Sequence, residues 1–225
     1  MLRAIVFDFD GVIANSEPLH YRGYREVLAE EGVTLTEADY YARYLGFDDV
    51  GAFEAIGRDS GAAWTAARIA GFVARKAVRL EELERDVSVL FPGAAEAIRR
   101  ASAAMPIAVA SGARGDEIRR VLVRENLLAC FTAIVAAEDT AVSKPAPDPY
   151  LRALTLLTPA RGGQLRPSDC IAIEDSHWGL ESARAAGLRT VAVTNTYAAD
   201  QLTADLTISS LENMDLDRLS RICSD

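Results

Sequence analysis

Residues 3–17 read RAIVFDFDGVIANSE, and this stretch decides how the rest of the chain is interpreted. Residues 4–7 are apolar, too few for a helix and rich in strand-forming side chains. The run ends at Asp8 and Asp10, spaced so that both point the same way while the strand conformation persists. Packing does not explain two acids there, because an unpaired buried charge is costly. The pattern indicates a bound cation or a reaction, with turn-forming hydrogen bonds as the alternative.

The length and charge of the chain limit what it can do. Its 225 residues suffice for one large domain, or for one domain with a sizeable insertion. The net charge of −9 argues against nucleic acid and anionic membranes as partners, since both need basic patches. A small anionic substrate is still compatible with it, because a bound divalent cation would change the local field.

Cysteine usage and apolar runs predict the compartment. The three cysteines lack metal-site spacing, and Cys170 heads an apolar run typical of a core thiol. No apolar run reaches the roughly 18 residues of a membrane span, and no signal peptide is apparent. We therefore expect a reduced, soluble, cytoplasmic protein. No feature of the sequence indicates the oligomeric state, and a monomer is the default expectation.

Residues 17–87 carry a helical pattern throughout, with no convincing strand. Asp48 is placed to begin a helix that ends near Gly57, and a long alanine-rich helix is expected from Trp64 to about residue 86. The aromatic residues of this block are expected in its core rather than in a substrate site: Tyr40, Tyr41, Tyr44 and Trp64.

After residue 92 the pattern alternates between strands and helices. Strands are expected at residues 106–110, 134–136, 170–174, 190–193 and 206–208, with helices between them and a plain loop at residues 160–167. Such alternation predicts a parallel sheet with helices on both faces. The first strand, residues 4–8, belongs with this set, so an all-helical block interrupts an α/β domain after its first strand.

Polar side chains follow four of these strands, where ligands of open α/β sheets bind. Asp8 and Asp10 follow the first strand, Ser111 the second, Lys144 lies beyond the third, and a Glu174–Asp175 pair follows the fourth. Each has a structural alternative: a helix cap for the serine and the acids, a surface position for the lysine. Their occurrence in order at matching points of the sheet favours a shared site.

These motifs resemble the haloacid dehalogenase superfamily, in its magnesium-dependent phosphatase and phosphomutase branch. The chain is especially similar to the subfamily of beta-phosphoglucomutases and phosphoglycolate phosphatases. The motifs are DFDGVIANSEPLH at 8–20, ASGAR at 110–114, SKPAPDPY at 143–150 and IEDSHWGLESARAAG at 173–187. The resemblance implies a Rossmann-like α/β core of residues 1–15 and 90–225, with a helical cap domain, residues 16–89, inserted after the first strand.

The resemblance also implies a mechanism and a cofactor. Asp8 would be the nucleophile that forms an aspartyl-phosphate, and Asp10 the general acid and base. Mg²⁺ would be held by Asp8, the main-chain carbonyl of Asp10, and Asp175, with Glu174 nearby. The implied activity is hydrolysis of a phosphate monoester of a small metabolite, a sugar phosphate or a phosphoglycolate-like compound.

Further residues are implied in binding the phosphate or the substrate. Gly11 lets a ligand approach the main chain closely. Ser111, Gly112 and Lys144 would bind the oxygens of the transferring phosphoryl group. His20, early in the first cap helix, either orients Asp10 or reports cap closure, or is a solvated helical histidine.

Alternative activities differ in the residues they require. The alternative function is a sugar phosphomutase similar to beta-phosphoglucomutase. Those enzymes carry a lysine and an arginine where this chain has Leu45 and Asp49, which disfavours a second phosphate in the cap. Phosphonate hydrolysis needs a cap lysine, for which Lys76 is the candidate, and dehalogenation needs no proton donor such as Asp10. A binding module without catalysis is disfavoured, because nucleophile, acid, lysine and metal acids are all present.

Overall fold

We describe the protein from a computed structural model, which covers residues 1–45, 47–85, 87–158 and 165–223. The chain divides into two compact units. The first unit comprises Met1–Asn15 and Val89–Asp225, and the second comprises Ser16–Ser88. Each unit is described by itself.

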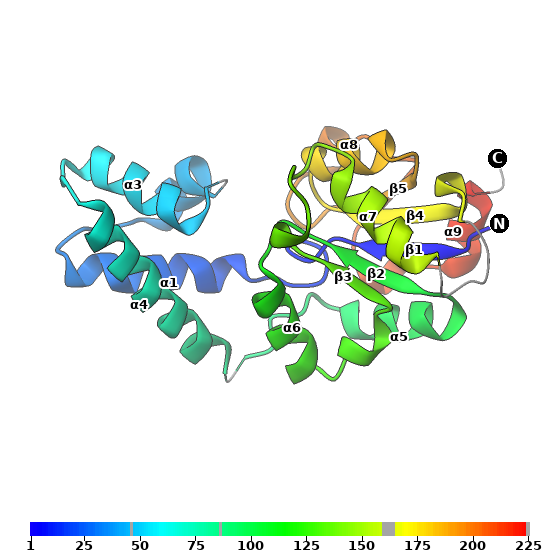
Figure 1. Ribbon diagram of the computed structural model, residues 1–225, viewed down its shortest axis with the longest axis horizontal. Coiled ribbons are helices and arrows are strands. Elements are labelled where there is room, and N and C mark those ends of the chain that lie inside the picture. Colours follow the sequence, from blue (N-terminus) through cyan, green and yellow to red (C-terminus); the bar gives the residue numbers. More distant parts are fainter. Residues whose placement is uncertain (46, 86, 159–164, 224–225) are drawn as a thin grey trace. The chain divides into compact units, whose positions relative to one another are not determined.

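The first unit is built on a parallel sheet of six strands in the order β3-β2-β1-β4-β5-β6 (Figure 1). The strands are β1 (Ala4–Phe7), β2 (Ile107–Ala110), β3 (Ala133–Val135), β4 (Cys170–Glu174), β5 (Arg189–Val193) and β6 (Leu206–Ile208). The expected parallel α/β sheet is confirmed, and β1 lies between two strands that come much later in the chain.

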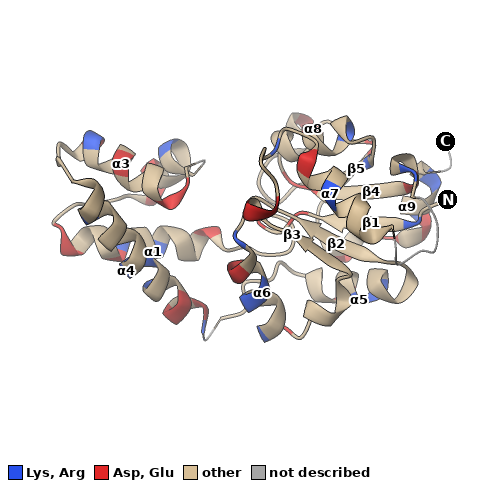
Figure 2. Ribbon diagram, viewed as in Figure 1, with Lys and Arg blue, Asp and Glu red and all other residues tan. Residues whose placement is uncertain are grey.

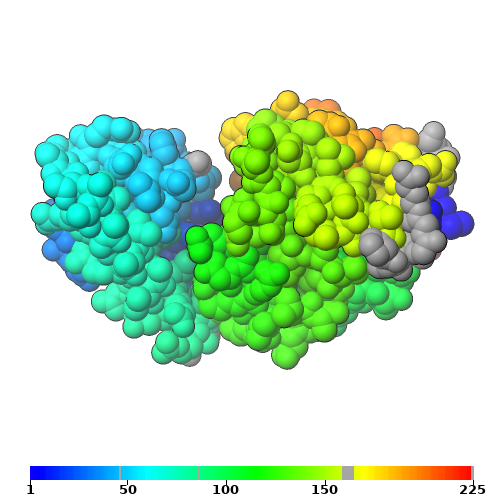
Figure 3. Space-filling model, in the orientation of Figure 1, coloured from blue at the N-terminus to red at the C-terminus, as the bar shows by residue number. Residues whose placement is uncertain are grey.

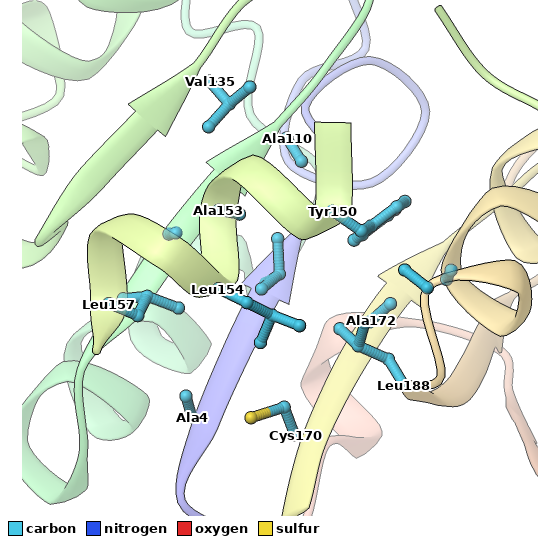
Figure 4. Packing of buried hydrophobic residues seen from close by; sticks show 14 of the residues in the cluster. Ala4, Ala110, Val135, Tyr150, Ala153, Leu154, Leu157, Cys170, Ala172 and Leu188 are labelled. Carbon is cyan, nitrogen blue, oxygen red and sulfur yellow. The ribbon is translucent and has the colours of Figure 1, made fainter. Parts of the chain in front are cut away.

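Helices cover the sheet, and small side chains allow them to approach it closely. They are α5 (Ala94–Ala104), α6 (Gly115–Arg124), α7 (Asp148–Leu157), α8 (His177–Ala185) and α9 (Leu216–Ile222). Alternate strand residues contribute to one core cluster with α7 and α8: Ala4, Val6, Ala108, Ala110, Cys170 and Ala172. Figure 4 shows α7 crossing over these strands, with Leu154 and Leu157 above the sheet. The cluster also buries Cys170 fully, which confirms it as a core thiol.

The central strand is fully enclosed. All four residues of β1 have no exposed surface. In the space-filling view the green and yellow-green segments, from α5 to α7, form most of the visible surface of the first unit (Figure 3). A strand buried on both faces reads as a continuous apolar run, which is the pattern of residues 4–7.

The second unit is entirely helical in its described residues. It contains α1 (Glu17–Glu30), α2 (Glu37–Asp39), a π-helix (Tyr40–Tyr44), α3 (Asp49–Ser60) and α4 (Ala66–Glu84). Tyr40 and Tyr44 are buried in its core and Trp64 is partly buried there, as expected. The expectation was wrong for Tyr41, which is 39% exposed.

One helix end was also predicted wrongly. Gly57 lies inside α3, and the helix stops at Gly61, whose φ of 75° only glycine adopts readily. Gly57 is small for a packing reason, because a Cβ there would lie 2.7 Å from Cε3 of Trp64. The long helix is α4, which ends at Glu84. Residue 86, where the helix was expected to end, and residues 160–164 of the expected loop lie outside the described residues.

The chain leaves the first unit and returns to it through paired segments. Asn15 N donates to the carbonyl of Val89 at 2.6 Å, and Phe91 N donates to the carbonyl of Ile13 at 3.0 Å. These bonds place the ends of the inserted block side by side. None of the described helices combines the length and the apolar character needed to cross a membrane.

Candidate active site

The carboxyl ends of β1 and β4 form the centre of the candidate site. The register pairs Phe7 with Ile173, so Asp8 and Glu174 are the next residues on adjacent strands. Asp8 N donates to the carbonyl of Ile173 at 2.9 Å, which continues the ladder by one residue. Parallel pairing therefore places a carboxylate from the start of the chain beside one about 166 residues later, as the order of the motifs predicts.

Lys144 joins the two carboxylates. Its Nζ lies 2.9 Å from Oδ1 of Asp8 and 2.6 Å from Oε1 of Glu174. Asp8, Glu174 and Asp175 are all buried, and each offers a carboxylate oxygen within 4.8 Å of the others. The structure thus brings three of the predicted acids together with Lys144, which pairs with two of them.

Glu174 is held by two further donors that the sequence interpretation did not assign. The Tyr150 hydroxyl donates to Oε1 at 2.6 Å, and the Ser176 hydroxyl donates to Oε2 at 3.2 Å. Glu174 and Tyr150 have no exposed surface. Tyr150 stands in the quoted motif at residues 143–150, so its position in that motif was the available signal.

Burial and neighbouring charges shift the pKa values of the site. Burial and the neighbouring Glu174 raise the pKa of Asp8 well above its usual value, although Lys144 acts against this. Burial raises the pKa of Asp175 to about 6, against a hydrogen bond from Thr196 that lowers it. Burial alone lowers the pKa of Lys144, but Asp8 and Glu174 outweigh it and raise that pKa. The ammonium is therefore charged, whereas Asp8 and Asp175 keep their protons to a higher pH than free carboxyl groups do.

The loop after β1 packs tightly against Asp175. Gly11 has a φ of 76°, and its N–H donates to the carbonyl of Ala14 at 3.0 Å, which closes a turn. A Cβ at Gly11 would lie 1.9 Å from Oδ2 of Asp175. Glycine is thus required at this position both by its conformation and by the close approach of the acid. Asp10, one residue earlier, is half-buried, and its main chain forms an isolated parallel β-bridge with that of Ala14.

The turn after β5 reaches the same place, and the sequence interpretation gave it no role. The side-chain amide of Asn195 donates to the carbonyl of Gly11 at 2.8 Å, and the Thr196 hydroxyl donates to Oδ2 of Asp175. Both residues follow a predicted strand, which was the signal that could have identified them.

Ser111 and Gly112 follow β2, the other neighbour of β1. The Ser111 hydroxyl accepts the N–H of Ala113 at 3.1 Å, which is a local turn bond, and the N-cap of α6 is Arg114, so Ser111 does not cap that helix. Gly112 is exposed, and a Cβ there would meet no atom within 4 Å. The register places residue 110 level with Asp8, so Ser111 lies one position beyond it along the neighbouring strand.

His20 belongs to the second unit, where it is half-buried. Its Nδ1 lies 3.1 Å from Nζ of Lys76, which also pairs with Asp49. Lys76 is 1% exposed, so Asp49 supplies the opposite charge that a buried ammonium requires. His20 therefore stands in a polar cluster of the helical unit.

The residues of the first unit fit a hard divalent cation. Three buried acidic side chains lie together, and Lys144 pairs with two of them, so the site offers carboxyl oxygens that a cation could bind. Mg²⁺ prefers carboxylate, carbonyl and phosphate oxygens. Both carboxylate oxygens of Glu174 already accept hydrogen bonds from side chains. Asp8 and Asp175 are therefore better placed than Glu174 to bind the ion.

Comparison with known proteins extends over nearly the whole chain. The family model of haloacid dehalogenase-like hydrolases matches residues 5–193. Protein CbbY of Rhodobacter capsulatus is 34% identical over 228 residues, covering 94% of this chain and 96% of CbbY. Fructose-1-phosphate phosphatase YqaB of Escherichia coli is 27% identical over 206 residues, covering 84% of this chain and 95% of YqaB.

A solved structure shows the same fold. The crystal structure of a CbbY mutant from Rhodobacter sphaeroides in complex with xylulose-(1,5)bisphosphate superimposes with a TM-score of 0.79 at 26% identity. The match covers 95% of this chain and 96% of that one.

Proposed function

The chain belongs to the haloacid dehalogenase-like hydrolases, and on that basis we propose that it is a magnesium-dependent phosphatase acting on small phosphorylated sugars or polyols. The resemblance seen in the motifs is thereby confirmed at the level of the family. The observation that carries the proposal is the cluster of Asp8, Lys144, Glu174 and Asp175 at one edge of the sheet. The names of similar phosphatases support the substrate class.

In the proposed first step a carboxylate oxygen of Asp8 attacks the phosphorus atom. The bond from phosphorus to the substrate oxygen breaks, and Asp10 donates a proton to that oxygen as the alcohol leaves. In the second step water attacks the phosphorus of the aspartyl-phosphate, Asp10 takes the proton of the water, and inorganic phosphate is released. The two steps restore Asp8 and Asp10 to their starting states.

Charge stabilisation would come from the groups around Asp8. The Lys144 ammonium, fixed by Glu174 and Tyr150, is close enough to Asp8 to balance charge on the transferring phosphoryl group. Ser111 and Gly112 are proposed to bind the same oxygens. Mg²⁺, held by Asp8, Asp175 and the Asp10 carbonyl with Glu174 nearby, would neutralise phosphate charge when bound.

The proposal also covers the ligand, the oligomeric state and the cellular compartment. The chain has a net charge of −9, and Figure 2 shows Lys or Arg and Asp or Glu together on helices such as α3, α4 and α6. The proposed ligand is the phosphorylated metabolite, bound by a cytoplasmic monomer. All three cysteines are free, which supports a reducing compartment.

A metabolite panel tests the activity. The purified protein is incubated with sugar and polyol phosphates, phosphoglycolate and Mg²⁺, and released phosphate is measured. We expect phosphate release that Asp8→Asn abolishes and EDTA suppresses. No release from any compound, or equal release by Asp8→Asn, would refute the proposal. Interconversion of a sugar 1-phosphate and 6-phosphate without net release would indicate a phosphomutase instead.

A further inference from the structure

Three successive residues in the turn after β5 contact two segments of the candidate site, the loop after β1 and the connection from β4 to α8. Asn195 Nδ2 donates to the carbonyl of Gly11, in the loop after β1, at 2.8 Å. The Thr196 hydroxyl donates to Oδ2 of Asp175, at the end of β4. The ring of Tyr197 packs against that of His177, the first residue of α8, with 4.9 Å between centroids. We call residues 195–197 the β5 turn.

The two hydrogen bonds meet at one close contact. The carboxylate of Asp175 lies so near Gly11 that a Cβ would be 1.9 Å from Oδ2 and 2.4 Å from Cγ. Asn195 fixes the main chain on one side of this contact, and Thr196 fixes the carboxylate on the other. Displacement of either partner would change the distance between Asp175 and the loop that carries Asp10.

The geometry points to Thr196 and Asn195 as positioning residues for the proposed cation site. Thr196 holds Oδ2 of Asp175, which favours Oδ1 as the oxygen offered to a cation beside Asp8. Asn195 holds the Gly11 carbonyl and with it the orientation of the preceding Asp10 carbonyl. This inference rests on the proposed function, because it concerns how the proposed Mg²⁺ ligands are oriented.

Thr196 is exposed, so an effect of its replacement on cation binding can be distinguished from an effect on the packing of the core. Asp175, which accepts the hydrogen bond of Thr196, is 6% exposed. Removing one hydroxyl from an exposed side chain is expected to leave the fold intact. Its loss would instead release the carboxylate of Asp175, and a structural role would not produce that effect.

Titration with Mn²⁺ tests the inference without requiring a substrate. Mn²⁺ takes the same oxygen ligands as Mg²⁺, and the free ion is counted by its paramagnetic resonance signal. Thr196→Val keeps the shape of the side chain and removes the donor, and we expect it to raise the Mn²⁺ dissociation constant about tenfold. Thr196→Ser restores the hydroxyl and is expected to bind as the wild type does.

Two further variants control the comparison. Thr194→Val makes the same change two residues earlier. Among the described residues the Thr194 hydroxyl has no hydrogen-bond partner, so this variant should leave the Mn²⁺ dissociation constant unchanged. Asn195→Ala removes the hydrogen bond to the Gly11 carbonyl and should also weaken Mn²⁺ binding. Melting temperatures measured in EDTA establish that each variant is folded.

The outcomes distinguish the inference from the function on which it rests. Wild-type affinity in both Thr196→Val and Asn195→Ala would overturn the inference and leave the phosphatase proposal standing. Equal losses in Thr196→Val and Thr194→Val would also overturn it, since the effect would not follow the hydrogen bond. Absence of Mn²⁺ binding by the wild type would overturn the proposed cation site itself.

Discussion

Glu174 is the residue on which the site is assembled. It has no exposed surface, and Lys144 and Tyr150 both donate to its Oε1, each at 2.6 Å. A buried carboxylate is stable only when its charge and lone pairs are matched. Lys144 supplies the opposite charge, and the hydroxyls of Tyr150 and Ser176 donate to the remaining lone pairs. Glu174 in turn fixes the ammonium beside Asp8. The distance of 2.9 Å between Lys144 and Asp8 follows from this arrangement.

Replacement of Tyr150 tests this arrangement. Tyr150→Phe removes a hydrogen bond to a buried charged group, and we expect the free energy of unfolding to fall by about 2 kcal/mol. Urea denaturation measures the change. Tyr41→Phe is the control, because Tyr41 is 39% exposed, and it should have little effect. Equal stability of Tyr150→Phe and the wild type would contradict the account of Glu174.

The Asp49–Lys76 pair predicts a pH dependence in the helical unit. Burial alone raises the pKa of Asp49, but Lys76 and Tyr24 outweigh it and hold that pKa below its usual value. A carboxyl whose pKa is lower in the folded state stabilises the fold above the unfolded pKa. That stability is lost as the pH falls through the folded pKa.

Asp49→Asn tests this pair. At pH 7 it should lower the free energy of unfolding by about 2 kcal/mol, less than for a fully enclosed pair because Asp49 is one-third exposed. The difference should shrink below about pH 4, where the unfolded carboxyl is protonated. Denaturation at pH 7 and pH 3 measures it, with Asp200→Asn as an exposed control. A difference that stays constant with pH would contradict the prediction.

At the scale of elements, Gly179 allows the first turn of α8 to pack closely against the end of β4. A Cβ at Gly179 would lie 2.0 Å from the carboxylate of Glu174. Gly71 in α4 offers a matched control, since a Cβ there would meet nothing within 4 Å. The two glycines therefore occupy helices for different reasons.

Alanine substitutions separate these two cases. Gly179→Ala must displace Glu174, and we expect phosphate release to fall about a hundredfold, as for a misplaced catalytic group. Gly71→Ala should leave activity unchanged and raise the free energy of unfolding by about 1 kcal/mol, because alanine favours helix over glycine. Phosphate assays and urea denaturation measure both effects. Full activity in Gly179→Ala would show that Glu174 tolerates displacement.

The sequence predicted elements well where one cause determines the pattern. The strands at residues 4–7 and 170–174 were evident because burial on both faces makes them continuous apolar runs. Gly57 was misassigned because a glycine can mark a helix end or a tight packing contact, and only the position of Trp64 distinguishes the two. Asp8, Lys144, Glu174 and Asp175 were predicted to share a site because their charges stand out after strands, and the structure brings them together.

The partners of these residues were harder to predict. Tyr150, Asn195 and Thr196 are of residue types common in helices and turns. Their contacts depend on the strand order, which sets β4 between β1 and β5 and brings the turn after β5 to Gly11 and Asp175. The sequence pattern predicts a parallel sheet but not the order of its strands.

At the scale of the whole molecule, two features define the protein. One unit is an α/β sheet assembled from both ends of the chain, and the other is a helical block inserted after β1. The acids and the lysine that carry the proposed chemistry all belong to the first unit, and the Asp49–Lys76 cluster belongs to the second. The central claim is therefore that Asp8 of the first unit takes the phosphoryl group.

Trapping of the intermediate tests this claim most directly. The enzyme, in molar excess with Mg²⁺, is mixed with its best substrate from the panel and quenched in acid within one turnover. Peptide mass spectrometry then locates any added phosphoryl group. The account predicts that the peptide containing Asp8 gains the mass of one phosphoryl group, and that Asp8→Asn gains none. Release of phosphate with no phosphoryl group on Asp8, or with the group on another residue, would contradict it.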